Sequence, residues 1–137
     1  MNFNKFKEIA YALLDWNEHN LRAFHVSFLI RRNKILSIAV NKRKTHTINL
    51  RNKKFNRSGV DVSDAKFQCS EYCCIKQSKV QNIDYHKCKM VNVRITRENK
   101  LGLAAPCESC KSLLAFFNIK EIYFTNDSGE FEKYLTI

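Results

Sequence analysis

The only proline of this 137-residue chain, Pro106, stands directly before a Cys-x-x-Cys motif formed by Cys107 and Cys110. The motif leads into the apolar stretch SLLAFF, which has helical spacing, and Asn118 follows as a candidate residue to end the helix. Proline fits the first turn of a helix because backbone N–H groups there have no acceptor within the helix. The pattern therefore predicts a helix over residues 106–118 whose first turn presents two thiol groups.

A second cysteine-rich segment, CSEYCCIKQSKV at residues 69–80, predicts another helix with a cysteine at its start. Two helix starts at the edge of one sheet can converge on a single ion, and helix N-termini favour the negative charge of thiolates. Cys69, Cys107 and Cys110 would give Zn²⁺ three sulfur ligands and leave a fourth position for water, as in catalytic zinc sites. Glu71 would lie near the metal without binding it and could carry protons.

The rest of the chain predicts a single α/β domain over residues 1–137, with one mixed sheet of about five strands sandwiched between helices. Helical spacing of apolar residues indicates a first helix, and β-branched and aromatic runs around a polar Asn33-Lys34 turn indicate a hairpin. The C-terminal stretch GEFEKYLTI fits either an edge strand or a short helix. The expected elements are a helix over 4–16, strands over 23–32, 35–41, 88–96 and 121–126, and a long polar loop over 42–66.

The six cysteines fit a metal or catalytic role better than disulfide bonds if the protein is intracellular, because thiols stay reduced inside cells. The sequence contains no apolar run of about 18 residues that would cross a membrane. Its first residues lack the hydrophobic region of a signal peptide. We therefore expect a soluble intracellular protein that has no membrane partner and keeps its thiols reduced.

Positive charge is the second general feature of the sequence, with a formal net charge of +11 that attracts phosphate groups. Residues 42–57 contain seven basic side chains and no acidic one. These side chains are expected to follow a phosphate backbone, unless the run is only a solvated loop. His46, in the same run, is a further candidate for contact with a phosphate or a base. The basic residues are Lys42, Arg43, Lys44, Arg51, Lys53, Lys54 and Arg57.

Cys69-Ser-Glu71 followed by Pro106-Cys-Glu-Ser-Cys110 resembles the zinc signature of the cytidine and deoxycytidylate deaminase superfamily. The order of elements from about residue 23 to 126 is similar to that of its phage and bacterial members. The resemblance implies a three-layer α/β/α fold of the cytidine deaminase type, with Zn²⁺ held by the three cysteines. It also implies that Glu71 is the catalytic proton shuttle.

Substrate contacts are also implied by the resemblance. Asn41 corresponds to a position where many members contact the sugar, and the backbone around Ser70 would help to hold the base. Pro106 is the third residue expected to contact the substrate.

The reaction implied is the conversion of cytosine to uracil with release of ammonia, and three function classes stay open. The charge and the basic run favour cytosine in nucleic acid, with single-stranded DNA preferred over RNA. The compact size and the cysteine at the first ligand position favour a free nucleotide or nucleoside such as dCMP or cytidine. A third class is a catalytically inactive zinc protein that binds nucleic acid. The oligomeric state is also open, a homo-oligomer included.

A closed structural zinc site is the main alternative to an open catalytic one, because Cys73 lies one helical turn after Cys69 and could be a fourth ligand. A redox dithiol within the Cys-x-x-Cys motif is weaker, since it would not need a cysteine upstream. Glu71 alone would fit a residue that complements the helix dipole, and Cys74 and Cys88 fit buried core thiols. Packing is expected of Phe116, Phe117, Tyr123 and Tyr72, and surface exposure of His25 and His86.

Overall fold

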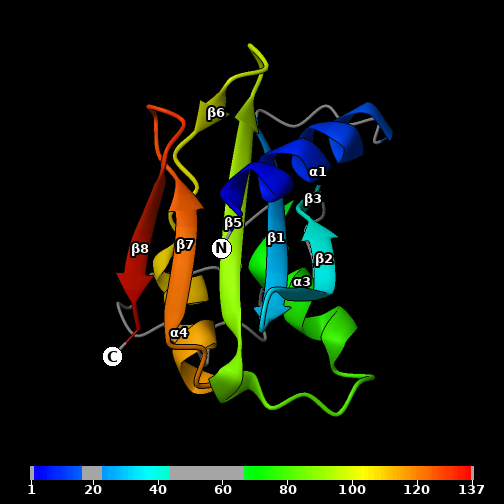
Figure 1. Ribbon diagram of the computed structural model, residues 1–137, viewed down its shortest axis with the longest axis vertical. Helices are drawn as coiled ribbons and strands as arrows, with labels where there is room; N and C mark the ends of the chain where they lie inside the picture. Colours follow the sequence, from blue (N-terminus) through cyan, green and yellow to red (C-terminus); the bar gives the residue numbers. More distant parts are fainter. Residues whose placement is uncertain (1, 17–22, 44–66, 137) are drawn as a thin grey trace.

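The computed structural model describes residues 2–16, 23–43 and 67–136, which form a sheet with helices on both faces (Figure 1). The helices are α1 (Phe3–Trp16), α3 (Ser70–Ser78) and α4 (Glu108–Phe116), with a 3₁₀ turn at Tyr85–Lys87. The strands are β1 (Ala23–Arg31), β2 (Lys34–Val40), β3 (Lys42–Arg43), β4 (Phe67–Gln68), β5 (Lys89–Thr96), β6 (Leu101–Gly102), β7 (Glu121–Thr125) and β8 (Phe131–Leu135).

The main sheet has six strands, ordered β2-β1-β5-β7-β8, with the short β6 paired to the end of β5. β1 is antiparallel to β2 and β5, and β7 is antiparallel to β8. β5 and β7 are parallel, as expected for two strands joined through a helix, here α4. Helix α1 covers one face of this mixed sheet, and α3 and α4 cover the other (Figure 1), so the predicted three-layer architecture is confirmed.

The face under α1 is apolar. Phe6 and Ala10 of α1 pack against buried side chains of β1 and β5, and the ring of Phe6 meets the ring of Phe28 edge-on with centroids 5.1 Å apart. Side chains alternate between the two faces along a strand, so every second residue of β1 and β5 reaches this cluster. Its buried strand members are Phe24, Val26, Phe28, Ile30, Val91, Val93 and Ile95.

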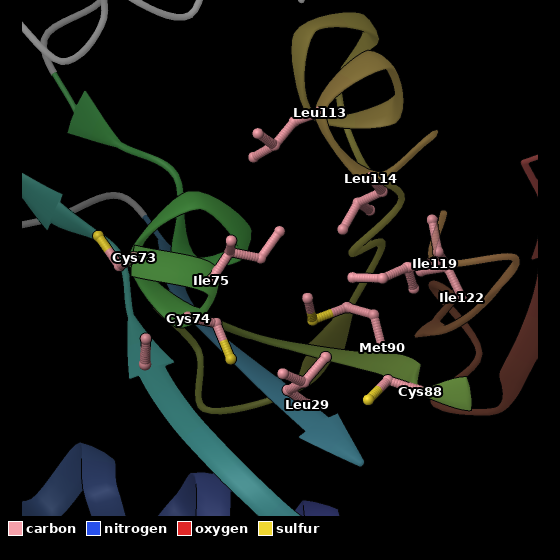
Figure 2. Close-up of a cluster of buried hydrophobic side chains, with 11 residues drawn as sticks. Leu29, Cys73, Cys74, Ile75, Cys88, Met90, Leu113, Leu114, Ile119 and Ile122 are labelled. Atoms are coloured by element: carbon pink, nitrogen blue, oxygen red, sulfur yellow. The ribbon is translucent and has the colours of Figure 1, made fainter. Parts of the chain in front are cut away.

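The opposite face holds a second buried cluster, which fixes α3 and α4 to the sheet. Figure 2 shows Leu114 of α4 and Ile119 close to Met90 of β5. Cys74 and Cys88 belong to this cluster and expose 0% and 3% of their surface, which confirms them as core thiols. Tyr72 and Phe117 pack against its margin as expected, and Tyr123 packs against the α1-side cluster. The further buried members are Leu29, Ala39, Cys73, Ile75, Leu113 and Ile122.

Some boundaries differ from those expected. The β1–β2 hairpin turns at Arg32 and Asn33, one residue earlier than predicted, and their φ angles of 51° and 64° are those of a two-residue type I′ turn. The C-terminal stretch is an edge strand, β8. The two-residue strands β3, β4 and β6 were not predicted, because so short a pairing leaves no periodic pattern in the sequence.

The end of α4 confirms one prediction and corrects another. Asn118 has φ 62° and donates its backbone N–H to the carbonyl of Ala115, so it ends the helix as expected. The prediction that Phe116 packs in the core is wrong, because this side chain is 60% exposed at the last turn. None of the helices in the described ranges is long and apolar enough to span a membrane.

Candidate metal centre and active site

Helices α3 and α4 both begin at a cysteine. Cys69 is the N-cap of α3 and Cys107 the N-cap of α4, each with extended backbone angles. Their carbonyl oxygens accept the first helical hydrogen bonds, from the N–H of Cys73 at 3.1 Å and of Lys111 at 2.8 Å. Neither cysteine caps its helix with its side chain. Pro106 is buried and precedes the N-cap, so it lies two residues before the first residue of the helix whose first turn it was expected to form.

The sulfur atoms of Cys69, Cys107 and Cys110 all lie within 4.8 Å of one another. Cys110 is buried in the first turn of α4, Cys69 is partly exposed and Cys107 is exposed, so the cluster reaches the surface. Among the described residues, this group contains no fourth histidine, cysteine or carboxylate. Cys73 packs in the hydrophobic cluster of Figure 2 and is not a member of the group. The geometry therefore fits the predicted open site better than a four-cysteine site.

The contacts among the three sulfurs favour a thiolate at Cys107 and thiols at Cys69 and Cys110. Hydrogen bonds from Cys110 and Cys69 lower the pKa of Cys107 far below its usual range, and donating those bonds raises the pKa of Cys69 and Cys110. A cluster with one stabilised thiolate and two thiols in contact with it is suited to a soft divalent cation, which would deprotonate all three. The donor set therefore fits Zn²⁺.

Glu71 lies in the first turn of α3 and is only 7% exposed. Its Oε1 accepts a hydrogen bond from the Ser70 hydroxyl (3.2 Å), and its Oε2 accepts one from the side-chain amide of Asn92 (3.3 Å). Burial raises the pKa of Glu71 to about 7, and the negative charge of Cys107 acts in the same direction. The carboxyl group is thus close to the cysteine cluster and can exchange a proton near neutral pH.

The prediction that His25 is exposed is wrong. This residue lies half-buried on β1, on the same face of the sheet as the cysteine cluster. Burial lowers its pKa to about 4, helped by the charge of Arg94, its cross-strand neighbour, and opposed by that of Cys107. The imidazole is therefore neutral at pH 7. His86 is exposed, as expected, and pairs with Asp84.

Asn41 follows β2 and is fixed to the backbone of His25. It accepts the His25 N–H on its side-chain oxygen (3.0 Å) and donates its own N–H to the His25 carbonyl (3.1 Å). Asn41 is thus held beside β1, the strand that carries His25. Its predicted contact with a sugar stays a prediction, as do the base contacts of Ser70, which is buried beside Glu71.

The predicted phosphate contacts lie mostly outside the described residues. Lys42 and Arg43 form β3, which pairs with β4, and β4 ends directly before Cys69. The other five basic residues and His46 belong to the stretch between these two strands and are not described: Lys44, Arg51, Lys53, Lys54 and Arg57.

Two buried residues next to Glu71 were missed by the sequence analysis. Ser27 on β1 and Asn92 on β5 are register partners, and the hydroxyl of Ser27 donates to the side-chain oxygen of Asn92 at 2.8 Å. The available signal was a polar residue in the middle of each of two apolar strands, AFHVSFLIR and KMVNVRIT. Such residues are uncommon in strands that are buried on both faces.

Comparison with solved structures identifies the fold. A cytidine deaminase from Burkholderia pseudomallei superposes with a TM-score of 0.64 at 15% identity, covering 99% of this chain and 94% of that one. A dCMP deaminase from the cyanophage S-TIM5, in complex with dCMP and dUMP, gives a TM-score of 0.55 at 10% identity, covering 90% of this chain and 80% of that one.

No protein-family model and no curated protein sequence matches the chain. At identities this low, structural similarity is informative about the fold and not about the substrate. The chain has the three-layer α/β fold of the cytidine and deoxycytidylate deaminase superfamily.

Proposed function

We propose that the protein is a zinc-dependent hydrolytic deaminase that converts cytosine to uracil and releases ammonia. The single observation that carries this proposal is the convergence of three cysteine sulfurs at two helix starts, with a buried carboxylate beside them. The fold shared with a cytidine deaminase and a dCMP deaminase supports the same reaction class.

Cys69, Cys107 and Cys110 would hold the metal. Bound zinc supplies a Lewis acid that makes water nucleophilic near neutral pH. Glu71 accepts one proton from the attacking water on a carboxylate oxygen and gives it to the ring nitrogen N3 of cytosine, where it remains in uracil. It then takes the second proton, from the hydroxyl group formed at C4, and gives it to the departing amine. Cytosine and water are thereby converted to uracil and ammonia, and Glu71 returns to its starting state.

Cytosine in single-stranded nucleic acid is the substrate that we propose first. The seven basic residues between 42 and 57 include Lys42 and Arg43 of β3, which pairs with β4 immediately before Cys69. The basic stretch therefore begins beside β4, the strand that leads into Cys69. Lysine and arginine side chains there would hold a phosphate backbone while one base enters the site.

A free cytosine nucleotide is the second candidate substrate. It is favoured by the cyanophage structure, which contains dCMP and dUMP. Arg94 is the cross-strand neighbour of His25, on which the charge of Cys107 also acts, and its guanidinium could attract a single phosphate. One phosphate needs fewer cations than the basic stretch supplies, and for that reason the polymer is placed first.

The test is incubation of the zinc-loaded protein with single-stranded oligonucleotide, duplex, dCMP and cytidine, followed by detection of uracil by mass spectrometry. Glu71→Gln should keep zinc and lose roughly 100-fold to 10,000-fold in rate, as expected for removal of a general acid–base group. Glu108→Gln is the matched control, because Glu108 occupies the first turn of α4 but is exposed and pairs with Lys111. This variant should keep full activity.

Three results would contradict parts of the proposal. Wild-type protein that binds zinc but deaminates none of the four substrates would be a binding protein instead of an enzyme. Turnover of dCMP alone would replace the polymer with the free nucleotide. Full activity in Glu71→Gln would remove Glu71 from the mechanism. Steep weakening of oligonucleotide binding with added salt is expected for the polymer.

A further inference from the structure

A ring of buried polar side chains in contact with one another lies between the sheet and the candidate site. Ser27 contacts both residues that hydrogen-bond the Glu71 carboxylate: its hydroxyl lies 2.7 Å from that of Ser70 and donates to Asn92 at 2.8 Å. Ser70 and Asn92 in turn donate to the two carboxylate oxygens of Glu71. Ser27, Ser70 and Asn92 are 0%, 2% and 3% exposed, so water cannot easily replace these bonds.

Asn92 also joins the two chain segments that carry the cysteines. Its side-chain nitrogen donates to Glu71 Oε2 on α3 (3.3 Å) and to the carbonyl of Ala104 (3.4 Å), which precedes Pro106 and Cys107. Asn92 is placed on β5, a central strand of the sheet. A rigid strand therefore fixes the carboxylate relative to the start of α4.

The partners of Asn92 determine the orientation of its amide. The Ala104 carbonyl and an ionised Glu71 carboxylate are acceptors only, so they require the NH₂ end of the amide. The Ser27 hydroxyl can satisfy the oxygen end by donating to it. If the amide were flipped, its oxygen would face two acceptors, the Ala104 carbonyl and the ionised Glu71 carboxylate, and both contacts would be repulsive.

We propose that Asn92 is a positioning residue for Glu71, held in its productive orientation by Ser27. Asn92 holds the carboxylate in one direction toward the cysteine cluster through Oε2. Ser27 acts one step further away, by fixing the Asn92 amide and by contacting Ser70. This inference rests on the proposed deaminase function for its kinetic consequence, whereas its geometric consequence can be tested without turnover.

The experiment compares Asn92→Asp and Ser27→Ala with Ser37→Ala as the matched control. Asn92→Asp keeps the shape of the side chain and removes its two donated hydrogen bonds. Ser37 is also a buried serine of the same sheet, but its hydroxyl donates to the Cys74 carbonyl and not to the side chains around Glu71. Zinc content, kcat and KM on the best substrate, and crystal structures of the folded variants are measured.

We expect kcat of Asn92→Asp to fall about 10-fold to 100-fold, with KM changed by less than about threefold and zinc content unchanged. Ser27→Ala should lose about threefold to tenfold in kcat, and Ser37→Ala less than about twofold. The crystal structures should show Glu71 displaced or in more than one orientation in Asn92→Asp and Ser27→Ala, and in its original orientation in Ser37→Ala.

The proposal is overturned if Asn92→Asp and Ser27→Ala keep the kcat of the control, or lose activity only in proportion to lost zinc. If Asn92→Asp does not fold, Ser27→Ala carries the same comparison. If the wild-type protein makes no uracil, the proposed function fails separately. The positioning role of Asn92 is then tested by the orientation of Glu71 in the variant crystals alone. A carboxylate that has not moved would contradict that role.

Discussion

The two faces of the central sheet are built in different ways, although the same strands supply both. The face under α1 is apolar from Phe24 to Ile30 along every second residue of β1, and aromatic rings from helix and sheet interlock there. The face under α3 and α4 starts apolar at Leu29 and Met90 but becomes polar at Ser27 and Asn92. The face under α1 serves only to stabilise the fold. The face under α3 and α4 contributes both to packing and to the candidate site.

This difference shows where the molecule can tolerate change. A buried apolar cluster loses stability in proportion to the volume removed, whatever chemistry takes place elsewhere. A ring of buried polar side chains tolerates few substitutions, because each donor or acceptor left unpaired costs free energy. Substitutions on the α1 face should therefore change unfolding free energy alone, whereas those on the other face should change the site as well.

The largest expected effect comes from neighbouring residues of β1 that point to opposite faces. Phe28→Ala and Leu29→Ala should each lower the free energy of unfolding by about 3 kcal/mol, since both side chains are fully buried. Leu29 packs in the cluster that includes Ile75 of α3, the helix that begins at Cys69. We therefore expect Leu29→Ala to weaken zinc binding and Phe28→Ala to leave it nearly unchanged.

Urea denaturation measures the stability loss, and competition with a chromophoric chelator measures zinc affinity in the folded variants. A loss of zinc affinity at least tenfold greater for Leu29→Ala than for Phe28→Ala would support the division between the faces. Equal losses in the two variants would mean that the faces are not separate in this way.

The smallest expected effect lies at the charged end of β7. Glu121 contacts Lys133 at 2.8 Å and Lys89 at 3.2 Å, and the hydrogen bond from Lys133 is the main cause that lowers the pKa of Glu121. A lowered folded-state pKa stabilises the protein above the unfolded-state pKa, and this contribution is lost as pH falls through the folded-state value. Glu121→Gln should therefore cost about 0.5 kcal/mol at pH 7.

Thermal denaturation at several pH values tests the contribution of Glu121 and its two lysine partners. The difference between wild type and Glu121→Gln should disappear in acid, below the lowered pKa of Glu121, and should shrink in high salt. Uracil production should not change, because Glu121 has no described contact with the candidate site. A difference that persists at low pH would assign the effect to packing instead of charge.

The parts of the fold that could be predicted from the sequence are those marked by periodic apolar spacing or by residues with special backbone properties. Apolar spacing located α1, and Pro106 with Cys107 located the start of α4 to within two residues. Phe116 was misjudged because the helical pattern continues to the last turn, where the chain leaves the core. The cysteine cluster was predicted because three cysteines at two helix starts, with this spacing, form a strong motif.

The polar ring could not be derived in the same way. Ser27 and Asn92 are 65 positions apart, and only the register of β1 with β5 places one opposite the other. A single polar residue in an apolar strand has many explanations, and a sequence does not show which strands are neighbours. His25 was taken as exposed for the same reason, since its burial depends on which elements lie beside β1 in the fold.

The most direct test of the account is the zinc stoichiometry of the intact protein, measured by native mass spectrometry on wild type, Cys110→Ser and Cys88→Ser. Cys88 is a buried thiol outside the cluster and is the matched control. We predict one zinc ion per chain in wild type and Cys88→Ser and none in Cys110→Ser. Wild-type protein that binds no zinc, or Cys110→Ser that keeps one ion per chain, would contradict the claim that these three sulfurs hold the metal.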